Sequence, residues 1–310
     1  MQDFEQRAGA PPAFRHNPFH YVRLWHQRLH VIPSIRPAQP QDMKTPSAGR
    51  RVAYRRADCG PRRTLSRGLL AACATLAAAT HGAAYAGESQ DNFSAGGNVA
   101  ITSDYIYQGV SESDGHPALQ ADVHAGAGGW FLGAWASTRD RDFPPGASSE
   151  LEAYLGHRFN LDNTWSATLS ARSHYFLRPS QTSADFQELS ASVAWLDRWT
   201  FTLAAIPNAV RWYGYVRLNR SPAWVADTAG QWLLGRGVSV TGAIGYYYST
   251  SAGAGEQAGA GYAYGNVGLA YEERQWRVDV GYFLAQNRAQ QLFPYPAANR
   301  QVAGTVSWRF

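Results

Sequence analysis

From residue 98 to the end of the chain, the sequence consists of segments of about ten residues separated by turn-rich breaks. Within these segments apolar side chains occupy every second position and polar ones the positions between them. In the segment 165–177, Trp165 and Leu169 lie on one face, whereas Arg172 and His174 lie on the other. Successive side chains of a β-strand point to opposite faces of the sheet, so a period of two predicts strands. The sequence therefore predicts an all-β domain.

Two arrangements of such strands compete. A soluble sandwich or lipocalin-type barrel buries its apolar faces, whereas a membrane barrel turns them outward to lipid. Charged residues recur on the polar faces of most segments, too many for a dry core. We therefore expect a transmembrane antiparallel up-and-down β-barrel in the outer membrane of a Gram-negative bacterium, in contact with outer-membrane lipid.

Aromatic residues and the last segment favour the same fold. Trp and Tyr at the ends of apolar rows are typical of the interfacial girdles of membrane barrels. The first segment is expected to point Val99, Ile101, Tyr105 and Tyr107 outward. The last segment alternates and ends in Phe310, which resembles the terminal signature that the barrel-assembly machinery reads. The expected girdle residues are Tyr105, Trp165, Trp195, Trp199, Trp232, Tyr248, Trp276 and Trp308.

The breaks between segments predict the number of strands. Tight turns are expected at residues 128–129, 162–163, 197–198, 236–237 and 273–274, and longer loops at 111–116, 139–149, 179–185, 208–221, 250–260 and 287–299. Short turns alternate with long loops in membrane barrels. These eleven connections predict twelve strands, with ten and fourteen as the alternatives. Residues 210–219 also alternate, and we assign them to an extracellular hairpin arm or loop.

The segment before the barrel has the order of a secretory signal. Residues 62–86 contain a basic start, a short apolar stretch and the sequence Ala84-Tyr85-Ala86, which predicts a cleaved signal peptide with cleavage after Ala86. A transmembrane anchor, a lipoprotein box ending at Cys73 and a twin-arginine signal are the alternatives. Residues 1–61 show no sustained period and are expected to be a disordered extension, with the true translation start at Met43 or nearer Arg62. Residues 87–310 are the predicted barrel.

The charge of the chain is unevenly distributed. Residues 1–86 carry 13 Lys or Arg and 4 Asp or Glu, whereas residues 87–310 carry 15 Arg and 19 Asp or Glu. The mildly acidic barrel lacks the basic surface of a nucleic-acid partner. Both cysteines, Cys59 and Cys73, also lie in the leader, so the barrel cannot use disulfide or thiolate chemistry.

The expected function is a porin-like channel for passive diffusion of small solutes or ions. Twelve tilted strands close at a backbone radius of roughly 12 Å and leave a lumen of roughly 10 Å or less if the loops stay out of it. A slight acidic excess in the lumen predicts a weak cation preference, although the opposite charges also pair with one another. The candidate lumen-lining residues are Asp104, Asp122, His124, Glu150, Glu152, Arg158, Arg172, His174, Arg178, Glu188, Glu272, Arg277, Asp279 and Arg309.

Two other classes of function compete with the channel. Ser173 and His174 with Glu150 or Glu152 contain the residue types of a hydrolase triad, but alternation places Ser173 outward and His174 inward. We therefore expect no enzyme, and no metal or cofactor. A non-conducting barrel, serving as adhesin, receptor or structural envelope protein, would act through aromatic loop residues. Those residues are Arg211, Trp212, Tyr213, Tyr215, Phe293, Pro294 and Tyr295.

Three stretches of the barrel resemble a known family. Residues 98–113, 117–120 and 130–137, with the sequence Gly109-Val110-Ser111 in the first, are similar to the opening strands of the TorF family of porin-like proteins. The resemblance covers most of residues 93–310 and is clearest before residue 160. It implies an outer-membrane barrel of porin function. Where the family has an Arg before Gly-Val-Ser, this chain has Gln108, so no role of that Arg is carried over.

Overall fold

The computed structural model describes residues 93–140, 142, 146–177, 184–213, 216–251, 259–293 and 298–310. The expected extension, 1–61, and the expected signal peptide, 62–86, lie outside the described residues, as does Arg178.

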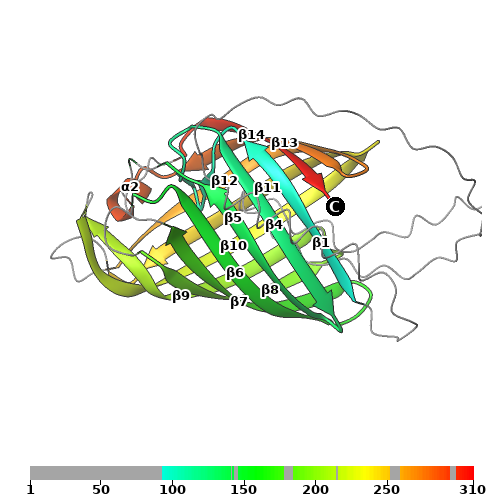
Figure 1. Cartoon of the computed structure of the whole chain (residues 1–310), viewed down its shortest axis with the longest axis horizontal. Helices are drawn as coiled ribbons and strands as arrows, with labels where there is room; N and C mark the ends of the chain where they lie inside the picture. Colours follow the sequence, from blue (N-terminus) through cyan, green and yellow to red (C-terminus); the bar gives the residue numbers. More distant parts are fainter. Residues whose placement is uncertain are drawn as a thin grey trace, which may run out of the picture. The chain divides into compact units, whose positions relative to one another are not determined.

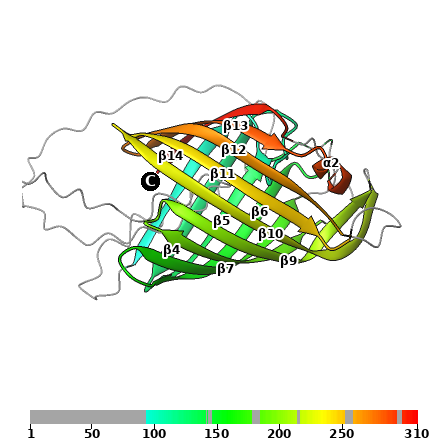
Figure 2. The same cartoon turned by 180° about the vertical axis from the view of Figure 1, so that it is seen from behind.

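Within the described residues, twelve strands form one closed antiparallel barrel, in which each strand pairs with its neighbour along the wall and β1 pairs with both β4 and β14 (Figures 1 and 2). The predicted fold class and strand count are confirmed. The barrel strands are β1 (Ser94–Thr102), β4 (Ala118–Ala127), β5 (Trp130–Thr138), β6 (Ser149–Asn160), β7 (Trp165–Leu177), β8 (Phe186–Trp195), β9 (Trp199–Tyr213), β10 (Val216–Gly235), β11 (Val238–Ser249), β12 (Ala260–Glu273), β13 (Trp276–Ala285) and β14 (Gln301–Arg309).

The two ends of the barrel differ in the length of their connections. The five predicted tight turns all lie at one end, which we call the turn end, together with the start of β1 and the end of β14. The other six connections lie at the opposite end, which we call the loop end. One of them joins β1 to β4 and holds a small separate sheet of β2 (Ile106–Tyr107) and β3 (Val110–Ser111). The connection between β13 and β14 contains the helix α2 (Ala289–Leu292).

Strands β9 and β10 project past the rest of the wall at the loop end (Figures 1 and 2). They contain 15 and 20 residues, whereas β5 and β14 contain 9 residues each. Their pairing continues from Trp199 and Gly230 to Tyr213 and Val216, with two register shifts. The alternation at residues 210–219 therefore belongs to a hairpin arm, which was one of the two forms that we predicted.

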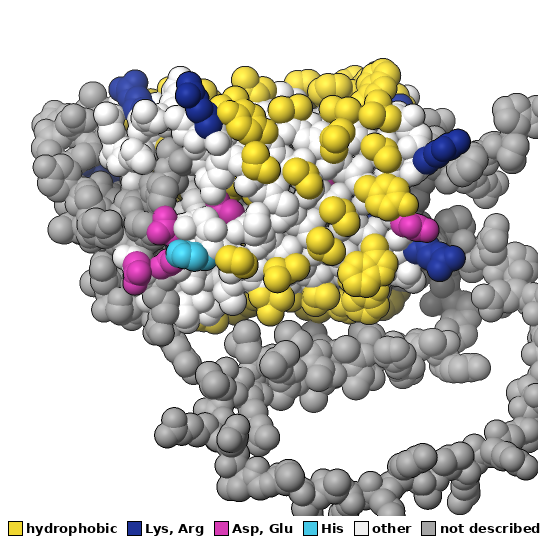
Figure 3. All heavy atoms as spheres, turned by 90° about the horizontal axis from the view of Figure 1, so that it is seen from above, with side chains coloured by type: hydrophobic (Ala, Val, Ile, Leu, Met, Phe, Trp, Pro, Cys, Tyr) yellow, Lys and Arg dark blue, Asp and Glu magenta, His cyan; other side chains and the backbone are white. Residues whose placement is uncertain are grey.

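The barrel has apolar side chains outside and charged side chains inside. Val99, Leu119 and Leu169 are 41%, 60% and 54% exposed, whereas Asp122 and Glu150 are 1% and 0% exposed. Figure 3 shows one outer face, on which apolar side chains spread over the strands and most charged ones gather towards the two ends. This pattern is the reverse of a soluble sandwich and confirms the predicted direction of the alternation. Seven of the eight expected girdle residues are exposed, Tyr105 being the exception.

The prediction for the first strand is wrong beyond Thr102. There the chain leaves the wall, and Tyr105 and Tyr107, expected to face outward, are 0% and 5% exposed. The expected loop 111–116 is likewise part of a longer connection that contains the two-stranded sheet. The alternation continues through these residues because β2 is itself a strand, but the surface that β2 faces is protein.

Candidate functional site

The connection between β1 and β4 folds into the barrel as a hairpin. Thr102 at the end of β1 and Ala118 at the start of β4 are paired neighbours in the wall. A short turn could join them, so the fifteen residues 103–117 are more than the connection requires. Between β2 and β3, Gln108 and Gly109 both have positive φ, 48° and 77°. Two consecutive positive-φ residues form the turn whose twist matches a tight hairpin. We call residues 103–117 the hairpin plug.

Three hydrophobic clusters hold the hairpin plug against different parts of the wall. Tyr105 and Tyr107 pack with Trp135 of β5 and Tyr154 of β6. Ile106 belongs to a cluster with Phe283, Ala298 and Ala303. Val110 belongs to the largest cluster, which includes Ile206, Tyr247, Tyr262 and Leu292. Each large apolar side chain buried in this way contributes about 1.5–3 kcal/mol, so several kcal/mol oppose release of the hairpin plug.

Hydrogen bonds fix the hairpin plug to the same walls. The Tyr105 hydroxyl donates to Glu150 Oε2 at 3.3 Å, and the Tyr107 hydroxyl donates to Glu188 Oε2 at 3.0 Å. From the opposite side, the Tyr262 hydroxyl donates to the carbonyl oxygen of Gln108 at 2.8 Å. The hairpin plug therefore has polar and apolar contacts on both sides of the interior, and these contacts fix its position inside the barrel.

The tip of the hairpin plug lies directly against the wall at Gly109. A Cβ atom at this position would come within 2.6 Å of Tyr264 Cβ and 2.9 Å of Ala285 Cβ. The Gly109 carbonyl oxygen also accepts a 2.8 Å hydrogen bond from the amide of Ala298. Both the positive φ and the close approach require glycine here.

We expect Gly109→Ala to loosen the hairpin plug, because the new methyl group overlaps β12 and β13 and the left-handed backbone costs about 1–2 kcal/mol. A cysteine at Val110, 2% exposed in the wild type, reports release through its rate of reaction with a bulky maleimide in a chain with Cys59 and Cys73 replaced by serine. Gly115→Ala is the matched control, since Gly115 has φ 71° but no atom nearer than 3.9 Å to the added Cβ. Equal labelling rates for the two variants would contradict this account of Gly109.

A network of buried charges lies between the hairpin plug and strands β6, β7 and β8. The Arg139 guanidinium bridges Glu112 of the hairpin plug and Glu150 of β6, where the Nη1–Oε2 distance is 3.0 Å. Arg172 lies 3.2 Å from Glu152 and 3.7 Å from Glu188, measured between nitrogen and carboxylate oxygen. Four carboxylates thus share two guanidinium groups. Removing one partner of such a buried network is strongly destabilising, because the other charges lose their compensation.

His174 lies inside this network, as the alternation predicted. Its Nδ1 atom is 3.1 Å from Glu150 Oε1 and 3.3 Å from Glu152 Oε1, and its ring is 0% exposed. Ser173 belongs to the opposite face of β7, so these residues form no hydrolase triad. Glu150, Glu152 and His174 offer ligand atoms within 4.8 Å of one another, a geometry that could hold a cation. Arg139 and Arg172 already contact these carboxylates, so the arrangement fits an ion-pair network.

The structure places the other predicted lumen residues in smaller groups. Asp122 contacts His124 Nδ1 at 2.9 Å and accepts a 2.8 Å hydrogen bond from the Tyr154 hydroxyl. Arg158 pairs with Asp197 at 2.7 Å near the turn end. Asp104 was expected on the wall but lies in the hairpin plug, where it accepts hydrogen bonds from Ser111 and Ser113. A further turn-end group consists of Glu272, Arg277, Asp279 and Arg309.

Small polar residues line another part of the interior. Ser170 of β7 and Ser190 of β8 are 2.7 Å apart between hydroxyl oxygens, and Ser192 and Thr202 are 3.1 Å apart. All four side chains are only partly buried. Short hydroxyl side chains leave room beside the wall and interact favourably with water. This surface differs from the tightly packed region around the hairpin plug.

Sequence reasoning missed the residues that close the interior. Arg139 and Glu112 were assigned to outer loops, and Phe293 to an exposed aromatic loop, whereas Phe293 packs 5.1 Å from Tyr247 and 6.1 Å from Tyr262 between ring centroids. A usable signal was present: Tyr154, Tyr247, Tyr262 and Tyr264 occupy inward positions of their strands. Inward aromatic rings on several strands indicate a packed interior, because burial of their large apolar surface against protein is favourable.

Comparisons with known proteins give a family but no activity. Among the described residues, no helix is long and apolar enough to cross a membrane. No curated protein matches the chain.

Several solved barrels resemble the structure. They include the NanC porin (9% identity, 70% of this chain and 98% of that chain, TM-score 0.42) and Salmonella typhi OmpF in complex with daunomycin (8%, 71% and 98%, 0.39). The Pseudomonas putida toluene transporter TodX is a third (11%, 72% and 90%, 0.36). Likenesses at this level say nothing of what the present barrel binds or carries.

The family comparison covers most of the barrel. The profile of the family described as "Bacterial protein of unknown function (Gcw_chp)" matches residues 86–303, so the chain is a member of the Gcw_chp family.

Proposed function

We propose that this chain is an outer-membrane channel for small solutes or ions, of the kind that its resemblance to the TorF family implies. The observation that carries the proposal is the reversed polarity of a closed twelve-stranded barrel: Leu119 and Leu169 face outward, while Glu150 and Arg172 lie inside. The apolar outer surface suits contact with lipid. The charged side chains inside suit a polar path through the barrel for solutes or ions.

The hairpin plug determines what the channel does at rest. It fills the interior at the level of Tyr105 and Val110, which are 0% and 2% exposed. Solutes pass only if the hairpin plug moves or if a narrow path remains beside the Ser170 and Thr202 wall. We therefore propose a channel of low resting conductance that the hairpin plug gates, with 103–117 as the moving part.

The packed interior of the barrel also supports a second candidate function. A barrel whose interior is packed by three hydrophobic clusters also suits a non-conducting adhesin, receptor or structural envelope protein. Single-channel recording in planar bilayers separates the two candidates, provided that both the wild-type barrel and a barrel without the hairpin plug are recorded. Discrete current steps in the shortened barrel support the channel, and silence of both folded barrels supports the alternative.

We further propose the export route and assembly partner that the sequence suggests. Residues 62–86 would serve as the signal peptide, and the barrel-assembly machinery would contact β14, which carries the half-exposed Phe310 at its end. N-terminal sequencing of the protein from the outer-membrane fraction should then begin at Gly87. Recovery of peptides from residues 1–42 in cell extract would contradict the downstream translation start.

A further inference from the structure

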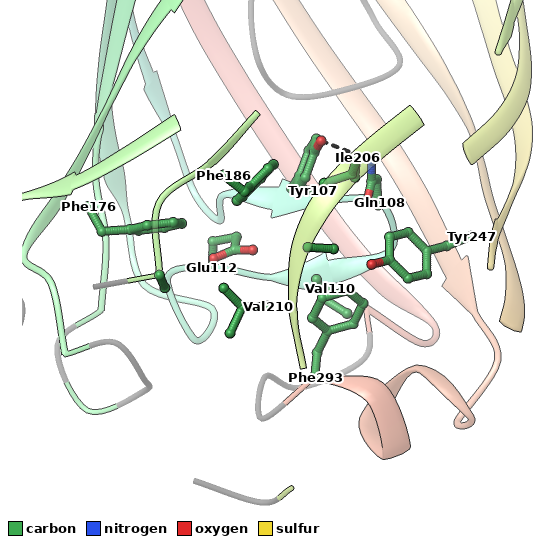
Figure 4. Close-up of a pocket in the computed structure, with 12 residues that line it drawn as sticks. Tyr107, Gln108, Val110, Glu112, Phe176, Phe186, Ile206, Val210, Tyr247 and Phe293 are labelled. Atoms are coloured by element: carbon green, nitrogen blue, oxygen red, sulfur yellow. Dashed lines mark hydrogen bonds between the residues drawn. The ribbon is translucent and has the colours of Figure 1, made fainter. Parts of the chain in front are cut away.

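A mostly apolar pocket lies at the loop end of the barrel interior, next to the hairpin plug (Figure 4). It encloses about 550 Å³ of space, including its open side. The hairpin plug forms one wall with Tyr107, Val110 and Glu112. Strands β7, β8, β9 and β11 form the others, together with Ala184 and with Phe293 from the connection between β13 and β14. A mostly apolar lining with a few polar groups is typical of sites for small molecules.

Aromatic rings form much of the surface of this pocket, and two of them are held from behind. Phe186 is stacked on His174 with 4.0 Å between ring centroids and 14° between ring planes. The Arg139 guanidinium carbon lies 4.7 Å from the centroid of Phe176. Because both partners belong to the buried charge network, the two phenylalanine rings are fixed before any ligand arrives. Rigid aromatic faces favour a flat, aromatic ligand.

The few polar groups of the pocket restrict the charge of that ligand. Glu112 lines the pocket, and the Tyr247 hydroxyl points into it (Figure 4). Arg139 is already bound between Glu112 and Glu150, and Arg172 between Glu152 and Glu188, so no arginine of the network is left over for an anion. A neutral ligand with one hydroxyl group can donate to the carboxylate of Glu112 or accept from the hydroxyl of Tyr247.

From these observations we infer that the pocket binds a small neutral aromatic molecule of one or two rings that carries a hydroxyl group. Binding requires the hairpin plug in its seated position, because Tyr107, Gln108, Val110 and Glu112 are part of the pocket surface. The ligand therefore stabilises the seated state. Binding does not require that the barrel conduct ions or solutes, so this inference goes beyond the proposed channel.

Isothermal titration calorimetry on the folded full-length protein in detergent tests the inference, with 1-naphthol as the probe and the heat of probe entering empty micelles subtracted. We expect saturable binding of 1-naphthol and binding of 1-naphthoate about tenfold weaker or more, since the anion meets an interior already rich in carboxylates. Equal affinity for the two probes, or heats no larger than those of empty micelles, would overturn the inference.

Two substitutions locate the site. Ala209→Trp fills the pocket from β9 and should abolish 1-naphthol binding, whereas Ala205→Trp on the outward face of the same strand should leave the affinity unchanged. If Ala209→Trp fails to fold, Tyr247→Phe keeps the ring and should weaken binding by about three- to tenfold, the effect of one hydrogen bond. Unchanged affinity in the folded pocket variants would place the probe elsewhere and refute the assignment.

A barrel without the hairpin plug separates this inference from the channel proposal. It should lose 1-naphthol binding while remaining folded, whatever its conductance. Retained binding would contradict a pocket that depends on the hairpin plug, and it would leave the channel proposal untouched.

Discussion

Replacing residues 103–117 by a two-residue Asn-Gly turn should raise the single-channel conductance of the barrel about tenfold, because the hairpin plug occupies much of the interior of a barrel roughly 12 Å in backbone radius. The wall should tolerate the change. Thr102 and Ala118 already face each other as strand partners, and Asn-Gly supplies the positive φ values of a tight hairpin turn. Conductance is measured in planar bilayers at fixed salt concentration, and heat modifiability checks that the barrel is folded.

A change of turn at the opposite end is the matched control. Replacing Gly128-Gly129 by Asn-Gly alters a tight turn without touching the hairpin plug, and we expect wild-type conductance. If the wild type and the shortened barrel conduct equally, the hairpin plug does not obstruct the path. If both are folded and silent, the barrel is not a channel, and the remaining wall residues, such as Glu150 and Arg172, suffice to close it.

The sequence predicted the wall well because lipid and interior impose opposite demands on alternate residues of every strand. Leu169 and Ser170 illustrate this: one is 54% exposed and apolar, and the other faces the interior and bonds to Ser190. This local contrast recurs in each strand, so the strand count and the direction of the faces followed from it.

The hairpin plug could not be predicted in the same way. Tyr105 and Tyr107 alternate with polar residues just as Val99 and Ile101 do, but the surfaces that they meet come from β5, β6 and β8, up to 81 residues away in sequence. Local periodicity shows which side chains share a face and not which surface that face meets. The turn sequence Gln108-Gly109 indicated a tight hairpin, yet only the space between distant strands decides that it folds inward.

The sequence predicted several of the charged residues of the interior, but not which of them form ion pairs. Asp122, Glu150, Glu152, Arg172 and His174 were all expected in the interior, where the structure places them. Their partners Glu112 and Arg139 come from connections at the loop end, which alternation cannot orient. Ion pairs between such distant segments depend on how the connections fold, and that depends on the interior volume available to them.

A pair of adjacent substitutions tests the polarity on which the membrane assignment depends. Leu169→Arg puts a cation on the outward face, four residues from the exposed Trp165, and we expect it to lower the free energy of unfolding in lipid bilayers by about 2–4 kcal/mol. Ser170→Arg puts the same cation at the same depth on the inner face, beside Ser190. There we expect a loss of about 1 kcal/mol, since water and carboxylates solvate the guanidinium and one hydroxyl hydrogen bond is lost.

Urea titration of the two variants folded into lipid vesicles measures the difference directly. Trp165 and Tyr175 lie on the same outward row as Leu169, so its depth is bounded on both sides within a single strand. On a surface that faces water, an exposed Leu→Arg change alters the free energy of unfolding by no more than about 0.5 kcal/mol. A Leu169→Arg cost no greater than that of Ser170→Arg would therefore contradict the assignment of the outer face to lipid. The physical reason for charged residues to line the interior would then be lost as well.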